Sequence, residues 1–174
     1  MSSFAPSITF QPLTESAFPM LQNWLNTPHV RLWWGEPEHE IKLMRQSMTH
    51  PFEQGFVASA DRQEFGYIQQ WRPTDYPDEE PWAADLPKDT VGIDTFIGDT
   101  TMIGKGLGTA MVHAFCAKLF DEGTNYLVID PDAKNMNAVK AYGKAGFKYL
   151  LDYTTPTGVT HLMDLTRSRF QRTL

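Results

Sequence analysis

Apolar positions repeat with a period of two in some segments of the chain and at helical spacing in others. Short alternating or continuous apolar runs are typical of strands, and a repeat of three to four residues is typical of amphipathic helices. The strand pattern occurs at residues 8–12, 55–60, 64–71, 91–97, 125–129, 147–153 and 159–165. The helical pattern occurs at residues 15–25, 36–48, 109–120 and about 135–145. Because strands and helices do not alternate strictly, the pattern predicts an α/β or α+β sheet with helices packed on it.

Two longer segments lack this periodicity and are predicted to be loops. Residues 28–34 end in the pair Trp33 and Trp34, and residues 73–89 are rich in proline and acidic side chains. A loop as long as the second is usually functional or mobile in a compact domain. No repeat, low-complexity tract or shift in composition marks a boundary, so we expect one domain over residues 1–174.

The composition is that of a globular protein with an excess of acid. Apolar residues make up 41% of the 174 residues, charged residues 21%, and the formal net charge is −6. A negative surface disfavours nucleic acid and attracts cationic small molecules. There is no apolar run long enough to span a membrane and no signal-peptide pattern, so we expect a cytoplasmic protein without a membrane partner.

Cysteine and histidine provide no metal-site pattern. Cys116 is the single cysteine, which excludes a disulfide within the chain, and its apolar helical surroundings predict a small core residue. The five histidines show no metal-ligand spacing. We therefore predict no bound metal and no nucleophilic triad.

A glycine-rich turn, IGKGLGT at residues 103–109, connects the predicted strand 91–97 to the predicted helix 109–120. The first amides of a helix lack partners, and glycine allows a ligand to approach the backbone closely, so the turn predicts a phosphate site. The sequence lacks the Gly-Lys-Ser/Thr ending of a Walker loop, and its last glycine interval is wrong for a dinucleotide-binding turn.

Two segments carry a resemblance to a known family. Residues 103–108 resemble the coenzyme-A pyrophosphate loop of the GNAT N-acetyltransferases, Arg/Gln-x-x-Gly-x-Gly/Ala, matching at Gly106 and Gly108 and departing at Ile103. Residues 135–147, NMNAVKAYGKAGF, resemble the second signature of that family, Asn-x-x-Ala-Ile/Val-x-x-Tyr-x-Lys-x-Gly-Phe. The resemblance implies one GNAT-type domain, with a central mixed and mostly antiparallel twisted sheet flanked by helices.

Within the superfamily the chain is most similar to the aminoglycoside 6'-N-acetyltransferases. The similarity lies in residues 30–35, 66–71, 92–99, 103–109 and 130–131, whereas residues 73–89 are less similar. It implies transfer of an acetyl group from acetyl-CoA to a primary amine, with the 6'-amine of an aminoglycoside as the preferred acceptor. By the same resemblance, the coenzyme would be held by Phe96, Ile97, Ile103, Gly104, Lys105, Gly106, Leu107, Gly108, Thr109, Asn135, Ala138 and Tyr142.

Two of the coenzyme candidates have an alternative interpretation. Lys105 would pair with a phosphate, but is as easily a solvated loop lysine. Asn135 would bond the pantetheine arm, but asparagine is also favoured as a helix N-cap, and both roles are compatible.

Asp94 and Tyr142 are the candidate catalytic residues. Aspartate is depleted from strand interiors, and partial burial of Asp94 would raise its pKa toward the value that a base needs. The resemblance makes Asp94 the general base on the acceptor amine and places Tyr142 near the coenzyme sulfur, where it would protonate the leaving thiolate. The alternatives are a structural carboxylate for Asp94 and a core side chain for Tyr142.

The acceptor would meet acidic and aromatic side chains. Asp130 closes the predicted strand 125–129 at the end where open sheets place ligands, although it also suits a turn before Pro131. The 73–89 loop would supply an anionic lid, but such acidic runs are more often simply solvated. The predicted acceptor-binding residues are Trp33, Trp34, Asp78, Glu79, Trp82, Asp94 and Asp130, with one of the paired tryptophans buried and one lining the pocket.

Two other functions stay open. The same coenzyme site would serve an acyltransferase for lysine or hydroxylysine amines of siderophore assembly, or for polyamines. A non-catalytic acyl-CoA-binding module is the third interpretation, which the departure at Ile103 favours and the presence of Asp94 and Tyr142 disfavours. The pattern allows a monomer or a homodimer.

Overall fold

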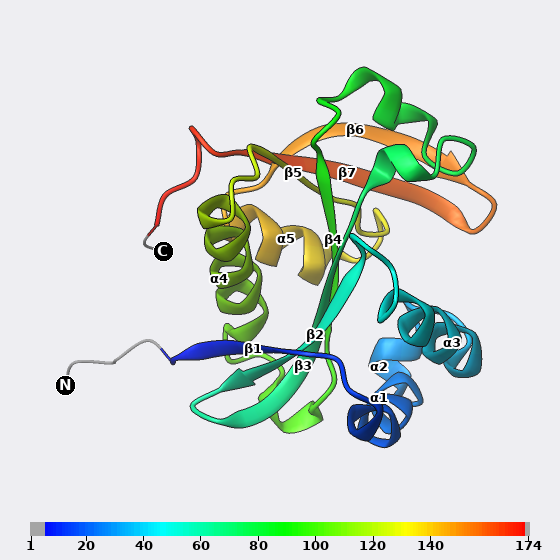
Figure 1. The fold of residues 1–174 in the computed structure, drawn as a ribbon, viewed down its shortest axis with the longest axis vertical. Helices are drawn as coiled ribbons and strands as arrows, with labels where there is room; N and C mark the ends of the chain where they lie inside the picture. The colour runs from blue at the N-terminus through cyan, green and yellow to red at the C-terminus, as the bar shows by residue number, and fades with distance from the viewer. Residues whose placement is uncertain (1–5, 173–174) are drawn as a thin grey trace.

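A seven-stranded sheet runs through the protein in the order β1-β2-β3-β4-β5-β7-β6 (Figure 1). The structure is a computed structural model that describes residues 6–172. Only β4 and β5 run parallel, and every other neighbouring pair is antiparallel, which confirms the mixed, mostly antiparallel sheet. The strands are β1 (Ile8–Pro12), β2 (Gln54–Ala60), β3 (Gln63–Trp71), β4 (Val91–Ile97), β5 (Tyr126–Ile129), β6 (Lys148–Thr155) and β7 (Gly158–Thr166).

Helices cover both faces of the sheet. One face carries α4 (Leu107–Asp121) and α5 (Met136–Lys144), and the other carries α1 (Phe18–Leu25), α2 (Pro28–Arg31) and α3 (Pro37–Ser47) (Figure 1). Short 3-10 turns lie at η1 (Glu15–Ala17), η2 (Pro73–Asp75), η3 (Pro81–Asp85) and η4 (Thr100–Met102). Within residues 6–172, no helix is long and apolar enough to cross a membrane.

The strand pattern locates every strand, but the two predicted loops contain more structure than expected. The predicted 28–34 loop holds α2, whose first residue Pro28 has the fixed φ angle that suits a helix start. The predicted 73–89 loop folds into η2 and η3. Helix α4 begins two residues earlier than predicted, so Gly108 and Thr109 lie in its first turn.

Three apolar clusters hold the layers together. The largest joins the sheet to α4 and α5 and includes Ile93, Phe115 and Cys116, all fully buried, as predicted for Cys116. Burying side chains of this size contributes about 1.5–3 kcal/mol each. The second joins the opposite face to α1, α2 and α3. The third fixes Trp82 of η3 against β5 and β7, and so holds the 73–89 segment beside the ends of the central strands.

Candidate active site

The two central strands diverge just before the predicted base. Parallel pairing of β4 with β5 covers only Val91–Ile93 against Leu127–Ile129. Asp94 and Asp130 each follow the last paired residue, while Asp94 stays in register with Gln69 of β3. Their side chains share one environment, because the charge of Asp94 raises the pKa of Asp130. The end of the pairing therefore brings together two of the predicted site residues.

Asp94 is held by a chain of two hydrogen bonds. The Gln69 side-chain amide donates to Asp94 Oδ2 at 2.8 Å, and the Tyr67 hydroxyl donates to Gln69 Oε1 at 2.6 Å. Burial raises the pKa of Asp94 to about 6, the bond from Gln69 lowers it in part, and the charges of Glu40 and Glu53 raise it again. A carboxylate with a pKa near neutrality suits general-base chemistry.

Replacing Asp94 with asparagine is expected to stabilise the folded protein at pH 8. Because the pKa of Asp94 is raised from 3.8 to about 6, ionising this group costs the folded state free energy. The protonated form of Asp94 therefore adds stability to the folded state. This stability is fully present below pH 3.8 and is lost as the pH rises through about 6. Each pKa unit corresponds to about 1.4 kcal/mol, so the variant should gain on the order of 3 kcal/mol at most. Urea unfolding at pH 4 and pH 8 measures it, and an equal effect at both pH values would contradict the linkage.

Asp130 takes part in a second hydrogen-bonded group. The Tyr153 hydroxyl donates to Asp130 Oδ2 at 2.9 Å and lies 3.3 Å from Glu80 Oε2. Burial, followed by the charge of Asp94, raises the pKa of Asp130 well above its ordinary value. Burial also raises the pKa of Glu80. This second group extends the site from the β5 end to the turn before η3.

The acidic loop presents a different residue to the site from those predicted. The side chains of Asp78 and Glu79 are exposed, whereas Glu80 is half-buried and contacts Tyr153. Three consecutive acids in an irregular loop carry no periodicity, so the sequence does not show which one turns inward. The role of Asp78 and Glu79 in acceptor binding stays a prediction.

The three predicted tryptophans differ in burial and in their contacts. Trp34 is half-buried and packs edge-on against Tyr67 and Phe96, with ring centroids 5.8 and 4.9 Å away. Trp33 is 39% exposed. Trp82 is buried, with its ring centroid 5.9 Å from that of Tyr153. Trp34 therefore packs beside Tyr67, whose hydroxyl donates to Gln69, and Trp82 packs beside Tyr153, whose hydroxyl donates to Asp130.

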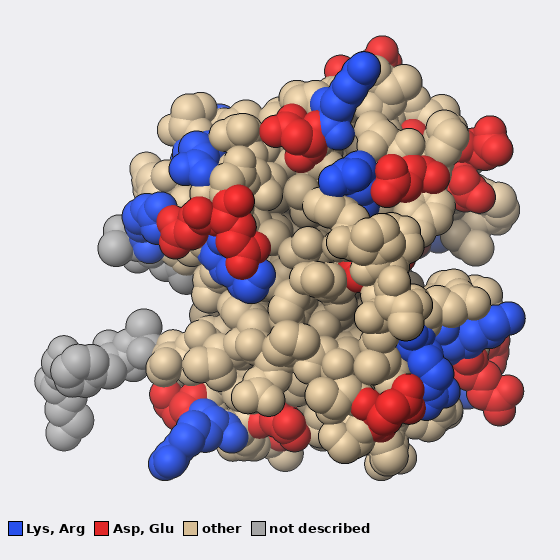
Figure 2. All heavy atoms as spheres, viewed as in Figure 1, with Lys and Arg blue, Asp and Glu red and all other residues tan. Residues whose placement is uncertain are grey.

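Asp94 and Asp130 belong to a group of five carboxylates that form no ion pair among the described residues. Besides these two, Glu40 of α3, Glu53 before β2 and Glu80 act electrostatically on the group. Among residues 6–172, none of the five forms an ion pair with Lys, Arg or His. The surface is hollowed between the upper and lower parts of the molecule, and acidic surface is visible inside the hollow (Figure 2). Such a region favours binding of a polycation.

The sequence pattern did not single out Tyr67, Gln69 or Tyr153. It also did not single out the glutamates at positions 40, 53 and 80. The alternation in residues 64–71 puts Tyr67 and Gln69 on one face of a strand, which was a usable signal. The register that aligns Gln69 with Asp94 is a property of the folded sheet. Nothing local in the sequence marks Glu40, Glu53 or Tyr153.

The predicted phosphate turn has free amides at the start of α4. Gly104 and Gly106 have φ angles of +77° and +79°, and Gly106 is the N-cap residue of α4. Within the described residues, the amides of Leu107, Gly108 and Thr109 donate to no acceptor. The partial positive charge of a helix N-terminus adds to these donors, so the turn fits the pyrophosphate of coenzyme A. Lys105 and Ile103 are exposed beside it.

The other coenzyme candidates are placed on both faces of the sheet. Ile97 and Ala138 pack against the cluster that contains α4 and α5. The Phe96 side chain packs with Trp24, Trp34 and Tyr67 on the opposite face, so only its backbone can contribute on the α4 side.

Three polar candidates already have partners or charged neighbours. Asn135 Oδ1 accepts from the Ala138 amide at 3.2 Å, which makes Asn135 the N-cap of α5. The Thr109 hydroxyl donates to the Ala141 carbonyl at 3.3 Å and so ties α4 to α5. Tyr142 is buried, and burial followed by the charges of Asp94 and Asp130 raises its pKa. The Tyr142 phenol therefore lies close to both carboxylates and stays protonated.

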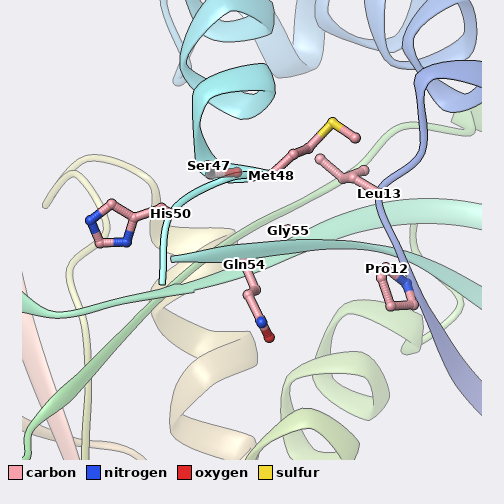
Figure 3. Close-up of a pocket in the computed structure, with 7 residues that line it drawn as sticks. All are labelled: Pro12, Leu13, Ser47, Met48, His50, Gln54 and Gly55. Atoms are coloured by element: carbon pink, nitrogen blue, oxygen red, sulfur yellow. The ribbon is translucent and has the colours of Figure 1, made fainter. Parts of the chain in front are cut away.

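Two further hollows lie outside this group of residues. One, of about 150 Å³, lies between the end of α3 and the starts of β2 and the β1–α1 connection, lined by Pro12, Leu13, Ser47, Met48, His50, Gln54 and Gly55 (Figure 3). A Cβ atom at Gly55 would lie 2.5 Å from the Tyr67 hydroxyl, so glycine is needed for Tyr67 to reach Gln69. The other hollow, of about 580 Å³, lies between the end of α5 and residues 168–171.

The diverging strands, the free amides at the start of α4 and the carboxylates Asp94 and Asp130 make up the candidate site. The GNAT acetyltransferase domain model matches residues 14–154. The aminoglycoside N(6')-acetyltransferase type 1 of Klebsiella pneumoniae is 32% identical over 96% of this chain and 87% of its own length. A kanamycin resistance protein of Rhizobium radiobacter is 37% identical over 53% of this chain and 86% of its own length.

Solved structures agree with these relatives. An aminoglycoside acetyltransferase, AAC(6')-Ib, in complex with coenzyme A has a TM-score of 0.85 and 30% identity, over 96% of this chain and 99% of its own. The same enzyme with coenzyme A and kanamycin has a TM-score of 0.84 and 29% identity, with the same coverage. The chain belongs to the GNAT acetyltransferase family. It is an N-acetyltransferase of the acetyl-CoA-dependent class.

Proposed function

We propose that this enzyme acetylates a primary amine of an aminoglycoside, with the 6'-amine as the preferred position and Asp94 as the general base. The observation that carries the proposal is the raised-pKa Asp94 within a group of five carboxylates that form no ion pair among residues 6–172, together with the free amides at the start of α4. The names and bound ligands of the relatives support the same acceptor class. Resistance to such antibiotics is the biological role that we infer.

The carboxylates, the amides at the start of α4 and Tyr142 have different tasks in the transfer. Acetyl-CoA supplies the acetyl thioester when bound. Carboxylates hold the acceptor as an ammonium ion, and Asp94 takes a proton from it, so that the amine lone pair is free to form the new C–N bond. The amides of residues 107–109 fix the pyrophosphate and thereby orient the thioester. With the thioester bound, the Tyr142 hydroxyl would give its proton to the departing sulfur as the C–S bond breaks. The second proton of the attacking nitrogen, which the new C–N bond makes acidic, would return the phenol to its protonated form.

The charge around Tyr142 makes it responsive to the acceptor. Burial, followed by the charges of Asp94 and Asp130, raises the pKa of Tyr142, so in the free enzyme the phenol is a weak acid. A bound ammonium ion would offset these two charges and lower the pKa of the phenol. Tyr142 therefore becomes a better proton donor when the acceptor is present.

The rate of acetyl transfer is expected to rise with pH through about 6 and then to level off toward pH 8. Asp94 accepts a proton only as the carboxylate, and its pKa is about 6 in the folded protein. Measuring kcat/KM from pH 5 to pH 8 at saturating acetyl-CoA tests this. A profile that is flat over that interval would exclude Asp94 as the base whose ionisation controls the rate.

Thiol release from acetyl-CoA, measured over a panel of acceptors, tests the proposed function. The panel contains kanamycin, a linear polyamine and lysine derivatives, and mass spectrometry with NMR locates the acetyl group on each product. We expect kanamycin to give the highest kcat/KM and a 6'-N-acetyl product. Faster turnover of a polyamine or a lysine derivative would show that this class of compound, and not an aminoglycoside, is the acceptor. Binding of acetyl-CoA without thiol release from any acceptor would indicate a non-catalytic module.

A further inference from the structure

The hydroxyl of Tyr67 has a fixed place in the core. Tyr67 is fully buried, and its ring packs against Trp34 and Phe96, with centroids 5.8 and 5.5 Å away. Gly55 of the neighbouring strand β2 leaves room for the hydroxyl, since a Cβ atom there would lie 2.5 Å from it. Within residues 6–172 this hydroxyl makes one hydrogen bond, to Gln69 Oε1 at 2.6 Å. The packing around the ring therefore holds the hydroxyl at the Gln69 amide.

Tyr67 determines which end of the Gln69 amide faces the proposed base. The amide oxygen accepts, the nitrogen donates, and a half-turn exchanges the two ends. With the oxygen toward Tyr67, the nitrogen donates to Asp94 Oδ2 at 2.8 Å, which is the one hydrogen bond of the Asp94 side chain in the described residues. After a half-turn the nitrogen would face Tyr67, and the buried phenol hydrogen would have no acceptor in residues 6–172. Because a buried donor without an acceptor is costly, the hydroxyl disfavours the half-turn.

The two orientations of the amide favour different forms of Asp94. The amide N–H stabilises the carboxylate, because a hydrogen bond to a charged acceptor is stronger than one to a neutral acceptor. The amide oxygen could bond only to the protonated carboxyl, which would donate to it. Tyr67 itself stays a donor, since burial, followed by the charges of Asp94, Glu40 and Glu53, raises its pKa well above the ordinary value.

We propose that Tyr67 is a positioning residue for the transfer: its hydroxyl keeps the Gln69 amide nitrogen toward Asp94 and so helps Asp94 to act as a carboxylate. In Tyr67→Phe the aromatic ring stays, but either end of the amide can face it at similar cost. A protonated Asp94 could then donate to the amide oxygen, so this form would persist to higher pH. The inference rests on the proposed function, in which Asp94 is the base, and names a residue that acts on the base through Gln69.

The other ionisable groups near Asp94 are the same with and without the Tyr67 hydroxyl. Each comes from a different part of the fold: Glu40 of α3, Glu53 before β2, Glu80 before η3, Asp130 after β5 and Tyr142 of α5. Among the described residues, none of them forms a hydrogen bond with Asp94. They therefore set the starting point of the Asp94 titration, and removing the hydroxyl changes only the amide beside it.

The test is the pH profile of kcat/KM for Tyr67→Phe, measured with kanamycin at saturating acetyl-CoA. We expect the midpoint to rise by about one pH unit, the order of size of one hydrogen bond to a charged group. The variant should lose about fivefold in kcat/KM at pH 6 and less than about twofold at pH 8.5, where Asp94 is ionised in both proteins. An equal loss at both pH values would indicate a merely structural role, and it would overturn the proposal, as would no loss at either.

The matched control is Tyr126→Phe. The Tyr126 hydroxyl also donates to an aspartate of a neighbouring strand, at Asp164 Oδ2, but this pair lies outside the hydrogen bonds that hold Asp94 and Asp130. The midpoint of this variant should stay at the wild-type value. Equal movement of the midpoint in Tyr126→Phe and Tyr67→Phe would contradict the proposal.

A second variant tests whether Tyr67 acts through Gln69. Gln69→Met keeps the length of the side chain but neither donates to Asp94 nor accepts from Tyr67. It should also raise the midpoint, and adding Tyr67→Phe to it should raise the midpoint no further. An unchanged midpoint in Gln69→Met would overturn the proposal. The same holds if Tyr67→Phe raises the midpoint as much in the Gln69→Met background as in the wild type, because the hydroxyl would then act by another route.

A titration followed by carbon NMR separates this inference from the proposed function. The side-chain carboxyl carbon of Asp94, assigned by its loss in Asp94→Asn, reports ionisation whether or not the enzyme acetylates kanamycin. We expect its midpoint to be about one pH unit higher in Tyr67→Phe than in the wild type. If Asp94→Asn keeps its kcat or kanamycin is not acetylated, the proposed function fails, and the titration still tests Tyr67. Equal midpoints in the two proteins would overturn the role of Tyr67 even if Asp94 is the base.

Discussion

Asp94→Asn is expected to lower kcat for acetyl transfer by about 10²–10⁴-fold, the usual contribution of a general base. The amide oxygen of the new side chain can still accept the hydrogen bond that Gln69 donates at 2.8 Å, so the local geometry should persist. An amide cannot take a proton from an ammonium ion at neutral pH. The loss should therefore appear in kcat, whereas the dissociation constant of acetyl-CoA should change less than twofold.

The control for this experiment is Asp75→Asn. Asp75 is an exposed aspartate of the same acidic segment, outside the hydrogen bonds that hold Asp94 and Asp130. It should keep at least half of the wild-type kcat. Should Asp94→Asn keep more than about a third of the wild-type kcat, Asp94 would be only a binding carboxylate, and the proton would leave the amine by another route.

Gly106→Ala is expected to weaken acetyl-CoA binding by about tenfold or more. Gly106 has a φ angle of +79°, and a Cβ atom in this left-handed conformation costs about 1–2 kcal/mol. Open space surrounds the position, so the cost comes from the backbone and is relieved only if the turn rearranges. A rearranged turn would rotate the amides of Leu107 and Gly108 away from the pyrophosphate. Calorimetric titration with coenzyme A measures the change.

Gly123→Ala provides a matched backbone control. Gly123 has a φ angle of +103° just after the other end of α4, also with open space around it. Both variants should lose similar thermal stability, but only Gly106→Ala should lose coenzyme affinity. Equal coenzyme affinity in the two variants would mean that the amides of the turn do not hold the pyrophosphate.

The fold was largely predictable because most of its strands and helices have strong local patterns. Residues 8–12 and 91–97 were predicted with the bounds that the structure has, since each is a short apolar or alternating run with clear ends. Helix α2 was missed because its four residues are too few to show a helical repeat. Local patterns also do not reveal which strands become neighbours, such as β5 and β7.

The candidate site was predictable to the extent that single residues stand out from their surroundings. Asp94 is an acid inside an apolar strand, and the glycines at 104, 106 and 108 form a motif, so both could be found in the sequence. Glu40, Glu53 and Tyr153 come from α3, the start of β2 and β6, and only the folded sheet brings them near Asp94. Glu80 was passed over in favour of Asp78 and Glu79 because loop orientation has no sequence period.

The short parallel pairing between β4 and β5 has a consequence for the order of folding. The hairpins β2–β3 and β6–β7 join neighbours in sequence and can form early, whereas β4 and β5 meet only after α4 has closed the long connection between them. On its other side β5 is held by β7, near the end of the chain. During synthesis, we therefore expect a nascent chain to stay inactive until β7 has left the ribosome, because until then only three residue pairs tie β5 to the sheet.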